Sequence, residues 1–183
     1  MSGANALVLF MRGVNVGGNN VFQPSLLAKE LSHLGVVNVG AAGTFIITGR
    51  CSQATLRSEI LNRLAFPAEL MICRGGDIVD LVARNPFPKE TVPSDVRRFA
   101  SVLARPPRTY SPLPHDFPSG KEWQVRFIEV SGRFALALWR RLGRTFVDPN
   151  GVAEKHFGVT ATTRNWNTIV RIAGILGGLW GRY

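Results

Sequence analysis

Short apolar runs and leucine stripes alternate in a regular order over the first 74 residues. Continuous or β-branched apolar runs predict strands, and leucines that recur every three or four positions predict helices. The expected elements are a strand at Ala6–Met11, a helix at Pro24–Leu34, strands at Val36–Val39 and Thr44–Thr48, a helix at Gln53–Leu64 and a strand at Glu69–Cys73. This order, strand-helix-strand-strand-helix-strand, predicts a ferredoxin-like subdomain.

The second half follows an α+β pattern less clearly. Asp77–Arg84 predicts a helix that ends at Asn85-Pro86-Phe87-Pro88, because the residue before a proline leaves helical geometry. We therefore expect an N-terminal subdomain at 1–84 and a basic C-terminal subdomain at 85–183. The later elements are a strand at Arg97–Leu103, a proline-rich loop at Arg105–Gly120, a hairpin of Trp123–Val130 and Arg133–Trp139, and helices at Gly151–Phe157 and Trp166–Leu176. The expected fold class is α+β, with two small subdomains whose antiparallel sheets carry helices on one face.

Composition agrees with a folded globular protein, since 45% of residues are hydrophobic and 19% are charged. The net charge is +10, and arginine supplies 18 of the 22 basic residues. Residues 1–88 contribute +2 and residues 89–183 contribute +8. Such a field favours phosphate-bearing partners, nucleic acid among them, although arginine enrichment can equally reflect the base composition of a genome.

Neither terminal apolar segment predicts a membrane span. The first run ends at Arg12, and the closing stretch Ile169–Trp180 contains Arg171 and is too short to cross a bilayer. We expect a cytoplasmic protein without a membrane partner. Cys51 and Cys73 match no zinc or redox spacing, so they are expected as buried thiols, with no metal and no cofactor.

A first polar signature, Arg12-Gly13-Val14-Asn15-Val16-Gly17-Gly18-Asn19-Asn20, follows the first strand. Two glycines have phosphate-loop spacing, but Asn19 and Asn20 stand where a nucleotide-hydrolysing loop needs Lys and Ser or Thr, which argues against a triphosphate hydrolase. One interpretation is an anion cradle built from Arg12, Asn15 and backbone N–H groups that include Gly17 and Gly18. The other is a turn in which the glycines supply positive φ and the asparagine bonds its own backbone.

A second signature, Thr162-Thr163-Arg164-Asn165-Trp166-Asn167-Thr168, precedes the last predicted helix. Arg164 would lie beside a helix N-terminus, which attracts anions, with Asn165 and Asn167 as donors and Trp166 as a stacking platform. In the alternative interpretation Asn165 caps the helix, Trp166 packs, and Arg164 pairs with a carboxylate such as Glu154.

Aromatic and arginine residues also share the predicted hairpin. The aromatic residues are Trp123, Phe127, Phe134 and Trp139, and the arginines are Arg126, Arg133, Arg140 and Arg141. Interleaving of this kind is typical of a sheet surface that stacks bases. Strict alternation instead places Trp123, Val125, Phe127 and Glu129 together on a core face.

In combination, the two signatures and Asn85-Pro86-Phe87-Pro88 resemble an uncharacterised bacterial family, domain of unknown function 1697. Members open with R-G-(I/V)-N-V-G-G, here Arg12 to Gly18, and close with E-K-x-x-G-x-x-A-T-x-R-N-W-x-T, here Glu154 to Thr168. The chain departs from the family where Asn19 replaces a common basic residue, where 41–44 replaces Q-S-G-N, and where a Ser-Lys pair is common near Arg144. The resemblance implies two α+β subdomains, the first ferredoxin-like, and no established reaction.

Three functions remain open from the sequence. The leading hypothesis is a non-enzymatic protein that binds a phosphate-bearing ligand or nucleic acid where the two signatures converge. The second is an enzyme on a small phosphorylated substrate, with Glu154 or His156 moving a proton. The third is an interaction scaffold whose signatures are structural. His33, His115 and His156 are too widely separated to predict a metal site, and the sequence does not determine the oligomeric state.

Overall fold

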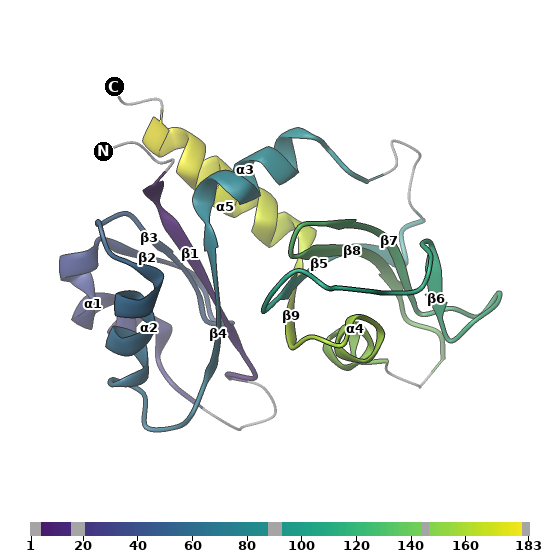
Figure 1. The fold of residues 1–183 in the computed structure, drawn as a ribbon, viewed down its shortest axis with the longest axis horizontal. Coiled ribbons are helices and arrows are strands. Elements are labelled where there is room, and N and C mark those ends of the chain that lie inside the picture. The colour runs from purple at the N-terminus through teal and green to yellow at the C-terminus, as the bar shows by residue number, and fades with distance from the viewer. Residues whose placement is uncertain (1–4, 16–20, 88–92, 144–146, 181–183) are drawn as a thin grey trace. The chain divides into compact units, whose positions relative to one another are not determined.

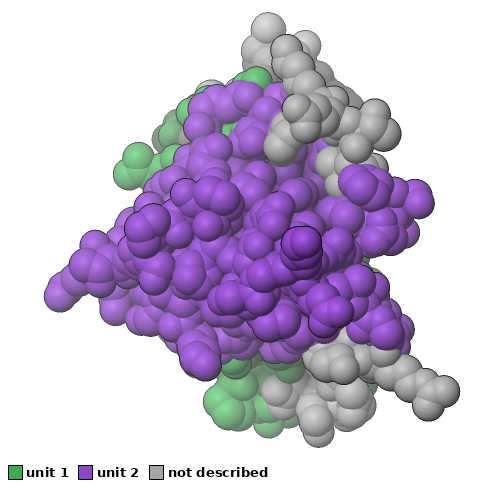
Figure 2. Space-filling model, turned by 90° about the vertical axis from the view of Figure 1, so that its right-hand side faces the viewer, with its two compact units in different colours: residues 1–83, 170–183 green, residues 84–169 purple. Residues whose placement is uncertain are grey.

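The fold divides into two compact units, residues 1–83 with 170–183 and residues 84–169, coloured green and purple in Figure 2. The structure is a computed structural model that describes residues 5–15, 21–87, 93–143 and 147–180. Each unit is an α+β assembly with its own antiparallel sheet, as the sequence predicts.

The first unit has the ferredoxin-like order predicted from the sequence. Its elements are β1 (Leu7–Arg12), α1 (Pro24–Glu30), the 3-10 turn η2 (Ser32–Leu34), β2 (Val36–Gly40), β3 (Thr44–Ile47), α2 (Gln53–Leu61), β4 (Glu69–Arg74) and α3 (Gly75–Ala83). The strands lie in the order β2-β3-β1-β4, and all neighbours are antiparallel. The first predicted helix therefore divides into α1 and a tighter turn, after which Gly35, at φ 61°, reverses the chain.

Period-two alternation in β1 divides its apolar side chains between the two faces of the sheet. Leu7, Leu9 and Met11 share a core with residues from α1 and α2, which lie together on one side of the sheet (Figure 1). Val8 and Phe10, on the other face, are also fully buried. A continuous apolar run without polar interruptions is what a strand covered on both faces requires.

The last helix, α5 (Trp166–Trp180), groups with the first unit from Val170 onward. Arg171 donates from Nη1 to the carbonyl of Val39, at 3.4 Å, and Leu176 is fully buried. Gly75 permits this packing, because a Cβ there would lie 3.1 Å from a methyl group of Leu176. The sequence places this helix in the subdomain 85–183, because local pattern does not show which sheet a helix covers.

The second unit is built on a five-stranded antiparallel sheet in the order β6-β7-β8-β5-β9. Its elements are β5 (Val96–Leu103), β6 (His115–Phe117), β7 (Val125–Ser131), β8 (Phe134–Arg140), α4 (Pro149–Phe157) and β9 (Ala161–Asn165), followed by the start of α5. The helix α4 packs through Ala153 and Phe157 on one face of this sheet. The strands β6 and β9 were not predicted, because each is short and is stabilised by a partner strand that lies elsewhere in the sequence.

An irregularity in β7 corrects the alternation expected for the hairpin. Phe127 pairs with Ala137, but Glu129 pairs with Leu136, so the register shifts between Phe127 and Glu129. The shift turns the carboxylate away from the core face, where it forms an ion pair with Arg84 at 3.1 Å. Val125 and Phe127 are fully buried, which confirms the core interpretation for those two positions.

None of the helices in the described ranges is long and apolar enough to cross a membrane.

Candidate functional site

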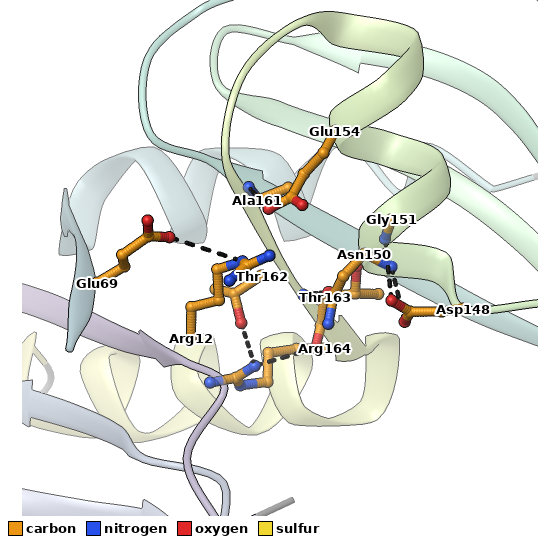
Figure 3. Close-up of polar contacts among 10 residues, drawn as sticks. All are labelled: Arg12, Glu69, Asp148, Asn150, Gly151, Glu154, Ala161, Thr162, Thr163 and Arg164. Atoms are coloured by element: carbon orange, nitrogen blue, oxygen red, sulfur yellow. Dashed lines mark hydrogen bonds and ion pairs between the residues drawn. The ribbon is translucent and has the colours of Figure 1, made fainter. Parts of the chain in front are cut away.

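The first signature begins where β1 ends. Arg12 is opposite Glu69 in the register of β1 and β4, and its Nε lies 3.6 Å from a carboxylate oxygen of that residue (Figure 3). The Arg12 side chain is 36% exposed, so this ion pair is at the surface. Gly13 follows with φ +66°, a left-handed conformation that directs the chain out of the strand.

Asn15 bonds the backbone at two positions distant from it in the sequence. Its side-chain amide donates to the carbonyl of Ala41 at 2.9 Å and accepts from the N–H of Phe22 at 2.9 Å. Its own φ is 54°, which asparagine tolerates better than most residues. The side chain therefore bonds two other segments of the backbone, not its own. Gly17 and Gly18, the remaining predicted cradle residues, lie outside the described residues.

The second signature is a strand over most of its length. β9 pairs with β5, with Ser101 opposite Thr163 and Ala100 opposite Arg164. Side chains along a strand alternate between faces, so Thr163 and Asn165 project to one face, and Thr162 and Arg164 to the other. Arg164 and Asn165 are predicted to act together at the N-terminus of the last helix, but their side chains project to opposite faces of the sheet.

Three side-chain acceptors hold the backbone of this segment. Glu154 accepts from the N–H of Ala161 at 3.0 Å, and Asn150 accepts from the N–H of Thr163 at 2.7 Å (Figure 3). Asn165 accepts from the N–H of Asn167 at 2.9 Å, which confirms the predicted cap of α5. Much of the polar character of the second signature thus serves local structure.

Arg164 is only 8% exposed. Its Nη1 donates to the hydroxyl of Thr162 at 2.8 Å and to the carbonyl of Thr163 at 3.0 Å. Burial lowers the pKa of this guanidinium to about 10, because removal from water disfavours the charged form. The side chain thus bonds its own strand from a largely dehydrated position.

Trp166 packs inside the second unit. Its ring contacts Phe87 edge to face, with centroids 4.9 Å apart, and it is 7% exposed. This arrangement leaves no open ring face on which a base could stack. Asn167, by contrast, is exposed.

A pocket that the sequence does not predict lies beside the second signature. It has a volume of about 220 Å³ and is lined by Phe99, Trp139, Pro149, Asn150 and Thr163. All five residues belong to the second unit, and they come from β5, β8, β9 and the first turn of α4. The only sign of this pocket in the sequence is the apolar alternation of β5 and β8. That alternation does not reveal that α4 leaves Phe99 and Trp139 partly uncovered.

The two histidines of the second unit lie together in an aromatic cluster. The rings of His115 and His156 have centroids 4.5 Å apart, and His156 stacks on Phe127. Burial, and secondarily the neighbouring His115, lowers the pKa of His156. Among the described residues, no group of three or more His, Cys, Asp or Glu side chains is placed to hold a metal ion.

The fold and these segments define a protein of two α+β units, the first of them ferredoxin-like. The family model described as "Protein of unknown function (DUF1697)" matches residues 5–114, and the chain belongs to that family. The match includes the first signature and Asn85-Pro86-Phe87-Pro88, and it ends before the second signature.

A solved structure of a conserved bacterial protein from Streptococcus pneumoniae has a similar fold, with a TM-score of 0.57 at 18% identity. The similarity covers 93% of this chain and 98% of that one. At this identity the likeness shows the fold alone. The comparison with curated proteins found no match.

Proposed function

We propose that the protein binds a phosphate-bearing ligand, with nucleic acid as the favoured class, through the cationic surface of its second unit and through residues of the two signatures. Arg12, Asn15, Gly17 and Gly18 would contribute from the first signature. Asn165 and Asn167 would contribute donors from the second. Arg164 and Trp166 would support Asn165 and Asn167 from beneath the surface of the second unit. A cytoplasmic location would give the protein access to such ligands.

The proposal rests on arginines of the second unit that bond neutral backbone carbonyls and therefore keep their positive charge. Arg97 donates to the carbonyl of Ser94, and Arg140 donates to the carbonyls of Trp123 and Lys121. A neutral carbonyl satisfies an N–H group but does not cancel the positive charge of the guanidinium. Arg105 and Arg141 add further exposed charge. A surface of this kind attracts phosphates over long distances.

The enzymatic alternative gains no support from its two candidate residues. Glu154 accepts the N–H of Ala161, and His156 packs in an aromatic cluster with a buried Nε2. A proton-transfer group needs access to the reacting atoms.

The test is binding of a fluorescent single-stranded RNA of ten nucleotides over a series of salt concentrations. Binding to phosphates releases counterions, so affinity should fall with salt. The slope of log affinity against log salt is negative. The double variant Arg105→Ala with Arg141→Ala should make it shallower by about 0.7 for each phosphate that the variant no longer neutralises. The matched control removes two exposed arginines of the first unit, Arg50→Ala with Arg74→Ala, and should change the slope less.

Binding that is absent at low salt, or equal losses in the two double variants, would overturn the proposal. Arg12→Ala tests the first signature separately. It should weaken binding without unfolding the protein, because its ion pair with Glu69 is at the surface.

A further inference from the structure

The pocket beside β9 has the form of a site for one planar ring. We propose that it binds a single nucleobase, so that the second unit holds a base here and the adjoining phosphate on its arginines. This inference rests on the proposed function and names the part of the ligand that would enter the pocket. All residues that line the pocket belong to the second unit.

Strand register places the floor of the pocket on the same sheet face as α4. Arg97 pairs with Trp139, and Ser101 pairs with Thr163, so these side chains project to one side. Further along the same strands, Leu103 and Ala135 lie in the core beneath α4. Because α4 begins only at Pro149, this helix does not cover the sheet face beyond its first turn.

Two aromatic side chains form the apolar walls. Phe99 and Trp139 meet edge to face, with centroids 6.1 Å apart and planes at 74°. The indole Nε1 of Trp139 donates to the carbonyl of Val147 at 3.4 Å, a long bond that favours one orientation of the ring. Both residues are only partly buried, unlike Trp166. A base can stack on one such ring and meet the other with its edge.

The polar edge of the pocket offers hydrogen-bond donors. Asn150 Oδ1 accepts from the N–H of Thr163, and this contact orients the side-chain amide and leaves Nδ2 to donate. The hydroxyl of Thr163 is 2.7 Å from that of Ser101. An amide N–H beside a hydroxyl suits the carbonyl oxygen or ring nitrogen of a base.

Size and charge restrict the ligand further. Pockets that enclose drug-sized molecules start at roughly 300 Å³. At about 220 Å³ this pocket suits one ring system, with the rest of the ligand outside. The first turn of α4 is not an anion site, because Asp148 already accepts from the N–H groups of Asn150 and Gly151. Arg97 is exposed and pairs with Trp139 across β5 and β8, so it can offer its charge to a phosphate on the same sheet face as the pocket.

The experiment compares a ten-nucleotide single-stranded RNA with a strand of equal length and charge that lacks bases. The wild-type protein should bind the base-bearing strand at least about fivefold more tightly, since stacking alone supplies that difference. Phe99→Leu and Trp139→Leu should remove the preference and leave the salt slope unchanged. Trp139→Phe keeps an aromatic ring and should retain it. Tyr110→Leu, an exposed aromatic residue elsewhere in the unit, is the matched control.

Equal affinity for the two strands, or a preference that survives both leucine variants, would overturn the base site. The proposed function would stand in that case if binding still weakened with salt. Loss of salt-dependent binding to both strands would overturn the proposed function itself. In that case nuclear magnetic resonance, with uridine and adenosine monophosphates as probes, tests whether the pocket binds a base. A shift of the Trp139 indole N–H would support a site for free nucleotides, and no shift at millimolar probe would refute the base site.

Discussion

The two signatures have similar residue types but use them differently. In the first, Arg12 ends the inner strand β1 in a surface ion pair, and Asn15 bonds the backbone of Phe22 and of Ala41. In the second, Arg164 is buried in a strand, while Asn165 caps the helix that follows. Arginine, asparagine and glycine in one segment are therefore not sufficient evidence for a ligand site.

The residues that stabilise the backbone of the second signature also differ from the residues that line the pocket. Residues of the second signature hold β9 and the start of α5, and the open pocket lies beside them on aromatic residues outside both signatures. A side chain that already bonds its own backbone has less capacity to bind a ligand. The partly buried aromatic residues and the exposed arginines of the sheet are thus better ligand candidates than the buried members of the signature.

The largest effect is expected in the turn that supports the first signature. A Cβ on Gly43 would lie 2.8 Å from both Met11 and Val14, and its φ is +66°. Gly43→Ala should lower the free energy of unfolding by about 3 kcal/mol, from steric overlap added to backbone strain. Gly13 has the same φ but no atom within 4 Å, so Gly13→Ala should cost only about 1 kcal/mol. Equal losses in urea unfolding would show that Gly43 does not pack as described.

A second prediction compares the two signature arginines. Arg164→Ala should lower the free energy of unfolding by about 2 kcal/mol, because it leaves a cavity and breaks the bonds to Thr162 and Thr163. Arg12→Ala removes a surface ion pair and should cost less than about 1 kcal/mol. Urea unfolding followed by circular dichroism measures both. A larger loss at Arg12 would reverse the distinction drawn between the signatures.

The smallest effect concerns pH and the helix α4 beneath the second signature. The pKa of His156 is lowered from 6.5 by burial and by His115, so the unfolded chain binds a proton at a higher pH than the folded protein does. The stability due to neutral His156 is fully present above about pH 6.5 and is lost as the pH falls below it. His156→Phe should therefore reduce the loss of stability between about pH 7.5 and pH 5.5.

The matched control for this pH effect is His115→Gln. It should reduce the loss in part, because it removes the smaller of the two causes of the lowered pKa. If the loss between the two pH values is unchanged in His156→Phe, another group is responsible for the acid sensitivity.

Local pattern predicted what depends on near neighbours in the chain. The leucine stripes gave α1 and α2, the apolar run gave β1, and Asn165 was expected to cap α5, which its hydrogen bond to Asn167 confirms. The ferredoxin-like order and the family resemblance were likewise confirmed, by the strand order of the first sheet and by the family match. These features need only residue spacing, capping chemistry and short motifs.

The tertiary structure decided what depends on distant partners. β9 is a strand because β5 lies beside it, and Glu129 leaves the core face because β7 shifts its register against β8. The pocket exists because α4 covers only part of a sheet face, so that Phe99 and Trp139 meet Asn150 from other parts of the chain. Spacing along the sequence predicts which residues could share a face. Pairing across the sheet determines which of them do, and which of those remain exposed.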